Sequence, residues 1–153
     1  QFPIISMLGP DSPMHFLAAS TLLGLKRALL YTKTGAIFVD RNDSQSRKES
    51  KEKMMQILLN GGNVFLFPEG TRKGLEKNGK AQNGVAYMAI RTGVPVIPVG
   101  IQGEMKPFRK VKLNIGEPLD FSQYKSNKPE KEILDKVSKE IMDNIIMLTN
   151  ENI

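Results

Sequence analysis

The residues best suited to chemistry form the run Phe67-Pro68-Glu69-Gly70-Thr71-Arg72, which follows an apolar stretch. The guanidinium of Arg72 offers a planar fork of donors that suits phosphate oxygens. Gly70 lets a ligand approach the backbone closely, because it has no side chain. Ligands of open α/β sheets gather beyond the carboxyl ends of strands, so this position favours an anion site. A turn with a solvated Glu69–Arg72 pair is the simpler alternative.

A second acid–arginine pair, Asp40 and Arg41, follows the apolar run 36–39. Either arginine alone would most often be a surface residue. If the two strands are parallel neighbours, Arg41 and Arg72 converge on one crevice, because the carboxyl ends of parallel strands share an edge. Two guanidinium groups there would bind a doubly charged phosphate monoester.

Short apolar runs alternate with amphipathic stretches along the chain. Near-continuous apolar runs of this kind are typical of strands buried on both faces. The predicted strands are 15–19, 36–39, 63–67 and 94–99, with 111–115 nearer a sheet edge. Apolar residues at helical spacing predict helices at 46–59, at 83–91 and from 129 onward. The alternation predicts an α/β fold: a single domain with a central, largely parallel or mixed β-sheet flanked by helices.

The composition fits one globular domain with an anionic partner. Lys and Arg number 22 against 16 Asp and Glu, and the net charge of +6 favours a nucleic acid, a phosphorylated substrate or an acidic lipid surface. The chain has no cysteine and one histidine, His15, so disulfides and Cys-type zinc sites are excluded within it and we expect no bound metal. No apolar run approaches the roughly 20 residues of a membrane-spanning helix.

These motifs resemble those of the glycerol-phosphate acyltransferase superfamily, in particular the 1-acylglycerol-3-phosphate acyltransferases. Phe67 to Arg72 matches the family's Phe-Pro-Glu-Gly-Thr-Arg block letter for letter, and Gly35 to Arg41 matches the block that ends in Asp-Arg. Two later blocks match Val94 to Pro98 and Gly116 to Leu119. The resemblance runs in order over essentially the whole chain and implies the glycerol-phosphate acyltransferase fold.

The resemblance implies a direct acyl transfer. The free hydroxyl of lysophosphatidic acid would attack the thioester of acyl-CoA or acyl carrier protein, giving phosphatidic acid for phospholipid synthesis without a further cofactor. The phosphate of the lysophospholipid would be bound by Arg41, Glu69, Gly70, Thr71 and Arg72. The acyl-donor side would be lined, or simply packed, by Val94, Pro95 and Pro98.

The family's general base is a histidine in a His-x-x-x-x-Asp motif, in which the aspartate orients the imidazole. His15 does not fit this motif, because residue 20 is serine and because His15 lies too close to the Asp-Arg block. We therefore expect His15 to be a strand residue, this chain to hold no catalytic residue, and the motif to precede Gln1. On this interpretation residues 1–153 are an acyltransferase domain that lacks its N-terminal portion.

Other interpretations stay open. Glycerol-3-phosphate or another lysophospholipid could be the acceptor, since the family often has a lysine at the position of Gln82. A non-catalytic homologue would bind phospholipid and lack the base. A nucleic-acid partner is not expected, because the chain has no tryptophan, no stacking pattern and no recognised motif. Basic pairs at 26–27 and 47–48 favour an acidic membrane surface, which the resemblance places on the cytoplasmic side.

Purified residues 1–153 should fail to transfer acyl groups to lysophosphatidic acid, because the expected base precedes Gln1. The gene product extended upstream should be active. Transfer from labelled acyl-CoA measures both proteins, and activity in residues 1–153 alone would overturn this placement of the base.

Overall fold

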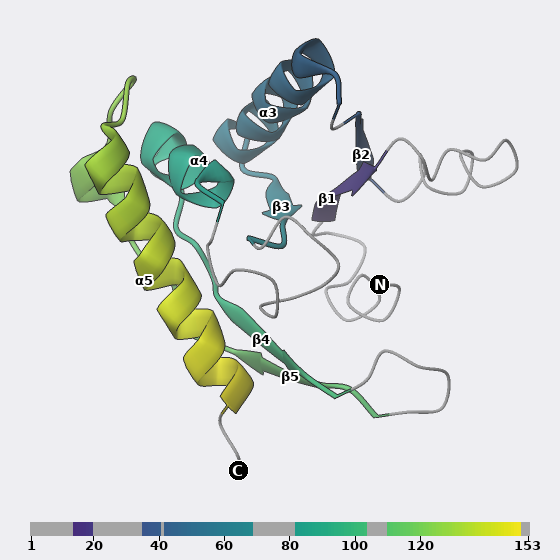
Figure 1. Ribbon diagram of the computed structural model, residues 1–153, viewed down its shortest axis with the longest axis vertical. Helices are drawn as coiled ribbons and strands as arrows, with labels where there is room; N and C mark the ends of the chain where they lie inside the picture. The colour runs from purple at the N-terminus through teal and green to yellow at the C-terminus, as the bar shows by residue number, and fades with distance from the viewer. Residues whose placement is uncertain (1–13, 20–34, 41, 69–81, 104–109, 151–153) are drawn as a thin grey trace, which may run out of the picture. The chain divides into compact units, whose positions relative to one another are not determined.

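A computed structural model describes residues 14–19, 35–40, 42–68, 82–103 and 110–150 (Figure 1). They belong to two compact units, which divide between Leu66 and Phe67. The first unit contains β1 (Met14–Ala19), β2 (Ala36–Val39), α3 (Ser44–Leu59) and β3 (Asn63–Phe65). The second contains α4 (Gly84–Thr92), β4 (Val99–Gln102), β5 (Lys112–Ile115), the 3₁₀ turn η3 (Ser122–Tyr124) and α5 (Lys131–Asn150).

The first unit is a three-stranded parallel sheet with a helix packed on it. The strand order is β2-β1-β3, and Phe16 of β1 pairs with Ala36 on one side and with Phe65 on the other. Helix α3 carries the chain from one outer strand to the other and packs against both. Its Met54 is buried, as are Ile37 and Val39 of β2. The strands predicted at 15–19 and 36–39 are confirmed.

Local side chains define where α3 begins and ends. The carboxylate of Asp43 accepts hydrogen bonds from the N–H groups of Gln45 (3.0 Å) and Ser46 (3.2 Å), which the first helical turn leaves without partners. The helix ends before Asn60, and Gly61 takes a positive φ of 79° that other residues rarely adopt. The predicted helix 46–59 is therefore confirmed, two residues longer at its start.

The second unit is built around a core shared by α4 and α5. The core's buried side chains are Ala86, Ala89, Ile90, Phe121, Val137 and Ile141. Helix α4 ends at Gly93, whose φ of 71° closes it in the left-handed conformation. The helices predicted at 83–91 and from 129 onward are both confirmed.

Helix α5 also covers one face of the antiparallel pair β4–β5. The side-chain amide of Asn114 donates to the Leu148 carbonyl (2.6 Å), and that of Gln102 donates to the Thr149 carbonyl (2.5 Å). Gly100 brings the β4 backbone close to the backbone of Leu148. The helix predicted from 129 onward thus flanks a sheet, as we expect for this fold class.

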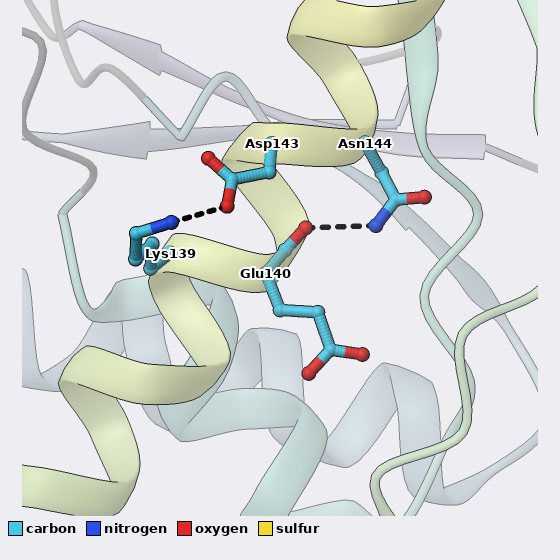
Figure 2. Close-up of polar contacts among 4 residues, drawn as sticks. All are labelled: Lys139, Glu140, Asp143 and Asn144. Atoms are coloured by element: carbon cyan, nitrogen blue, oxygen red, sulfur yellow. Dashed lines mark hydrogen bonds and ion pairs between the residues drawn. The ribbon is translucent and has the colours of Figure 1, made fainter.

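Polar contacts along α5 contribute far less than its buried face. Figure 2 shows the ion pair between Lys139 and Asp143 (2.5 Å) and the bond from the Asn144 amide to the Glu140 carbonyl (2.9 Å). The two charged side chains are 77% and 56% exposed, so water screens their attraction. Exposed pairs at this helical spacing stabilise by about 0.3–0.5 kcal/mol. Apolar burial therefore holds α5 in place.

Two predictions about the strands need correction. The strand predicted at 94–99 is wrong over most of its length: among residues 94–98 only Val96 pairs, in an isolated bridge with Leu119, and β4 begins at the last predicted residue, Val99. Pro95 and Pro98 explain the shift, because proline lacks the N–H that a strand ladder requires.

A single central sheet is not confirmed either, since the described strands form a parallel sheet in one unit and an antiparallel pair in the other. The strand predicted at 63–67 ends earlier, at Phe65, whereas 111–115 is confirmed as β5.

No helix within the described ranges combines the length and the apolar character needed to cross a membrane.

Replacing Gly100 with alanine should destabilise the second unit. The new Cβ would lie 2.5 Å from the Leu148 carbonyl carbon and 2.6 Å from the Thr149 nitrogen, and backbone atoms cannot move aside as a side chain can. We expect a loss of about 1–3 kcal/mol in the free energy of unfolding, measured with urea. Gly84→Ala is the control: its Cβ would meet nothing within 4 Å, so stability should be unchanged or slightly higher. A Gly100→Ala protein as stable as the parent would contradict the close contact between α5 and β4.

Candidate functional site

The candidate site begins at the edge of the first sheet where its strands end. All three strands are parallel, so their carboxyl ends lie at the same edge. Phe65, the last residue of β3, is level with Phe16, whereas Val39, the last residue of β2, is level with Ala19. β2 therefore extends further toward this edge, and the Asp40-Arg41 pair follows directly from it.

The strands that precede the two arginine motifs are not neighbours. β1 lies between β2 and β3, so the two strands are parallel but are not neighbours, and the condition set for Arg41 and Arg72 to converge is met only in part. Strands one position apart in a sheet lie about 5 Å from each other, and strands two positions apart lie about 10 Å from each other. The physical reason is that β1 offers both of its edges for pairing, which an alternation of apolar runs in sequence does not reveal.

The predicted phosphate-binding residues Arg41, Glu69, Gly70, Thr71 and Arg72 lie outside the described residues. Their roles therefore stay predictions, and the structure shows how the residues beside them are held. Among the described ranges, no group of three or more His, Asp or Glu side chains is placed to hold a metal ion.

Both residues next to Arg41 take part in a hydrogen-bonded turn between β2 and α3. The N–H of Asp40 donates to the hydroxyl oxygen of Ser46 (2.9 Å), and the carboxylate of Asp40 accepts from the N–H of Asn42 (2.9 Å). The carbonyl of Asp40 accepts from the N–H of Asp43 (3.3 Å), the residue that caps α3. The backbone on either side of position 41 is thus tied to the first turn of a 16-residue helix.

A second serine connects the end of β2 to the same helix. Ser50 is 5% exposed, and its hydroxyl lies 3.1 Å from the Phe38 carbonyl and 2.8 Å from the Ser46 carbonyl. Sequence reasoning missed Ser46 and Ser50. Their spacing of four residues, on a helix that follows the Asp-Arg motif, was the signal available for finding them.

His15 is a strand residue, as predicted. It lies in β1, and its Nδ1 is 3.1 Å from the Gly35 carbonyl, a geometry in which the ring N–H donates. At roughly 3.3 Å per residue, the four steps from His15 to Ala19 place it about 13 Å before the carboxyl edge of β1. The contact joins β1 to the start of β2 and gives His15 a structural partner.

Contacts from the second unit hold the residues beside the segment 69–81. The carbonyl of the buried Pro68 accepts from the N–H of Gln82 (2.9 Å). The next residue, Asn83, donates from its amide to the Asp135 carboxylate (2.7 Å) and accepts from the buried Ser138 hydroxyl (3.0 Å). The start of α4 is therefore tied to α5 by side chains more than fifty residues away in sequence.

The block that contains Val94, Pro95 and Pro98 is held by backbone hydrogen bonds. Val94 is half-buried, Pro95 is exposed, and Pro98 is buried with its carbonyl accepting from the Gly116 N–H (2.9 Å). Val96, inside this block, forms a bridge with Leu119, so the block pairs with the second matching block, Gly116 to Leu119. A place for these residues on the acyl-donor side stays a prediction.

The model of the Acyltransferase family matches residues 2–102. The chain belongs to the acyltransferase family. The match includes both arginine motifs and the block Val94–Pro98, and it ends with β4.

Parts of this chain are similar in sequence to known acyltransferases. A chloroplastic 1-acyl-sn-glycerol-3-phosphate acyltransferase of Brassica napus is 35% identical over 72 residues, which are 47% of this chain and 21% of that protein. A 1-acyl-sn-glycerol-3-phosphate acyltransferase of Haemophilus influenzae is 33% identical over 107 residues, which are 63% of this chain and 43% of that protein. The crystal structure of the 1-acyl-sn-glycerophosphate (LPA) acyltransferase PlsC from Thermotoga maritima superposes with a TM-score of 0.59 at 25% identity, covering 92% of this chain and 59% of that one. This chain thus spans less than two thirds of the length of each of these relatives.

Replacing Asn83 with alanine should lower the free energy of unfolding by about 1–2 kcal/mol, because the buried Ser138 hydroxyl loses its acceptor. Asn83→Asp keeps that acceptor but brings two carboxylates together at Asp135. Combining it with Asp135→Asn restores donor and acceptor in reversed order. Urea unfolding should therefore find the double variant more stable than Asn83→Asp alone, and strictly additive effects would contradict a direct contact between the two side chains.

Proposed function

We propose that this chain is part of an enzyme that acylates lysophosphatidic acid at its free hydroxyl and produces phosphatidic acid. The observation that carries the proposal is the run Phe67–Arg72 inside a family match that covers residues 2–102. The names of the Brassica and Haemophilus relatives and of the Thermotoga structure support this acceptor, because all three specify an acylated glycerol phosphate.

The reaction exchanges a thioester for an ester. The acceptor hydroxyl attacks the carbonyl carbon of acyl-CoA or acyl-acyl carrier protein, the carbon–sulfur bond breaks, and the thiol leaves with the proton that the hydroxyl loses. No further cofactor is needed, because the thioester itself supplies the activated acyl group. We assign no general-base role to His15, whose Nδ1 is directed to the Gly35 carbonyl.

Arg41 and Arg72 bind the acceptor phosphate in this proposal. Two guanidinium groups match the charge of a phosphate monoester and fix its orientation through paired hydrogen bonds. Glu69, Gly70 and Thr71 shape the same pocket. Binding energy from the phosphate, which does not react, then holds the distant hydroxyl in position for attack. The hydrogen-bonded turn formed by Asp40 and Asn42 supports this role, because it orders the residues on both sides of position 41.

The enzyme works at a membrane surface in this proposal, on the cytoplasmic side, because its acceptor and product are lipids. Arg47 and Lys48 are exposed on α3. Cations near an anionic lipid surface each contribute about 1 kcal/mol of attraction. Such residues would add to membrane binding without touching the acceptor.

Arg41→Ala and Arg72→Ala, each made in the full-length enzyme, should raise KM for lysophosphatidic acid by about tenfold to a hundredfold. That range corresponds to losing a charge-assisted hydrogen bond. Steady-state kinetics in neutral detergent micelles measures the effect. Arg47→Ala is the control, since it removes the same charge from an exposed helical position and should leave KM unchanged.

The acceptor itself provides the complementary comparison. The parent enzyme should prefer lysophosphatidic acid over monoacylglycerol, which lacks the phosphate, and both arginine variants should lose most of that preference. Unchanged kinetics in the variants would refute the phosphate role. A full-length protein that binds lysophosphatidic acid and never acylates it would instead be a non-catalytic phospholipid-binding homologue.

A further inference from the structure

The hydroxyl of Ser46 has a partner outside its own helix. It lies on the first turn of α3 and accepts from the N–H of Asp40, six residues earlier and directly before Arg41. The start of α3 does not need this hydroxyl, because the Asp43 carboxylate already accepts from the N–H groups of Gln45 and Ser46. The Ser46 side chain therefore stabilises the turn between β2 and α3.

The bond to Asp40 acts on conformation. Asp40 is exposed, so water could satisfy its N–H if Ser46 were absent. The hydrogen bond instead restricts the backbone at the end of β2 to one conformation. The Asp40 carboxylate then fixes the N–H of Asn42 on the other side of position 41.

Ser50 reinforces the same connection from inside the unit. Its buried hydroxyl lies within hydrogen-bonding distance of the Phe38 carbonyl, near the end of β2, and of the Ser46 carbonyl. Serine is a weaker helix former than alanine, so helix formation alone favours alanine at both positions. Both hydroxyls face the strand end that leads to Arg41.

We propose that Ser46 and Ser50 are positioning residues for Arg41, which rests on the proposed phosphate role of that arginine. They hold the backbone at positions 40 and 42 and so set the point from which the guanidinium reaches the phosphate. A long side chain that starts from a displaced backbone loses part of its ordered hydrogen bonding to its ligand, so the phosphate binds more weakly. The hydroxyls act only through Arg41 and do not touch the acceptor.

The test is a set of variants in the full-length enzyme with lysophosphatidic acid as the varied substrate. Ser46→Ala should raise KM about three- to tenfold, the factor expected for one lost hydrogen bond, and leave kcat within about twofold. Ser46→Thr keeps the hydroxyl and should restore the parent KM. Ser44→Ala is the matched control: it makes the same chemical change at an exposed position of the same helical turn and leaves the Asp40–Ser46 bond in place.

A double-variant cycle with Arg41→Ala separates this proposal from the phosphate role. Ser46→Ala should have no further effect on KM once Arg41 is alanine, because the guanidinium that Ser46 positions is then absent. If Arg41→Ala raises KM while Ser46→Ala does not, or if the two effects simply add, the positioning role is refuted and the phosphate role stands. If Arg41→Ala leaves KM unchanged, both are refuted. If the Ser46→Ala protein does not fold, Ser50→Ala takes its place in the same double-variant cycle.

Discussion

The first unit depends on backbone pairing of β1 with two parallel strands. A strand hydrogen-bonded along both edges fixes the direction and the register of both neighbours at once. Parallel strands cannot be joined by a tight turn, so the chain needs a crossover, and α3 supplies it between the two outer strands, β2 and β3. The turn that flanks Arg41 is where this crossover begins. Its geometry is therefore a consequence of the sheet as well as of its own residues.

Both described segments that border the arginine motifs are held by short polar side chains. In the first unit, Ser46 and Asp40 join a strand end to a helix start. In the second, Asn83 joins a helix start to Asp135 and Ser138 of α5. The Ser46 hydroxyl satisfies a backbone N–H that the end of β2 leaves without a regular partner, whereas Asn83 connects α4 to α5 through side chains alone.

The sequence predicts the helices better than the sheets, for physical reasons. A helix is determined by contacts three and four residues apart and by its caps, so periodic apolar residues with Gly61 or Gly93 at the end define α3 and α4 closely. A strand's neighbours are distant in sequence, which is why the position of β1 between β2 and β3 could not be predicted. The run 94–99 looked like a strand by hydrophobicity alone, and its prolines outweighed that pattern. The phosphate-binding residues are proposed from motifs alone, whereas Ser46 and Ser50 were missed because their four-residue spacing indicates a shared helix face but does not identify the strand end that they contact.

The end of the family match at residue 102 is not a structural boundary. β4 is the last element inside the match, yet all of its residues pair with β5, which lies outside it. Gly100 also lies against the backbone of α5, and the carbonyl of Pro98 accepts from Gly116. A chain ending at residue 102 would expose one edge of β4 and the face that α5 covers. The block Val94–Pro98 thus takes its backbone partners from residues outside the match, so the C-terminal part of the chain belongs to the same folded unit.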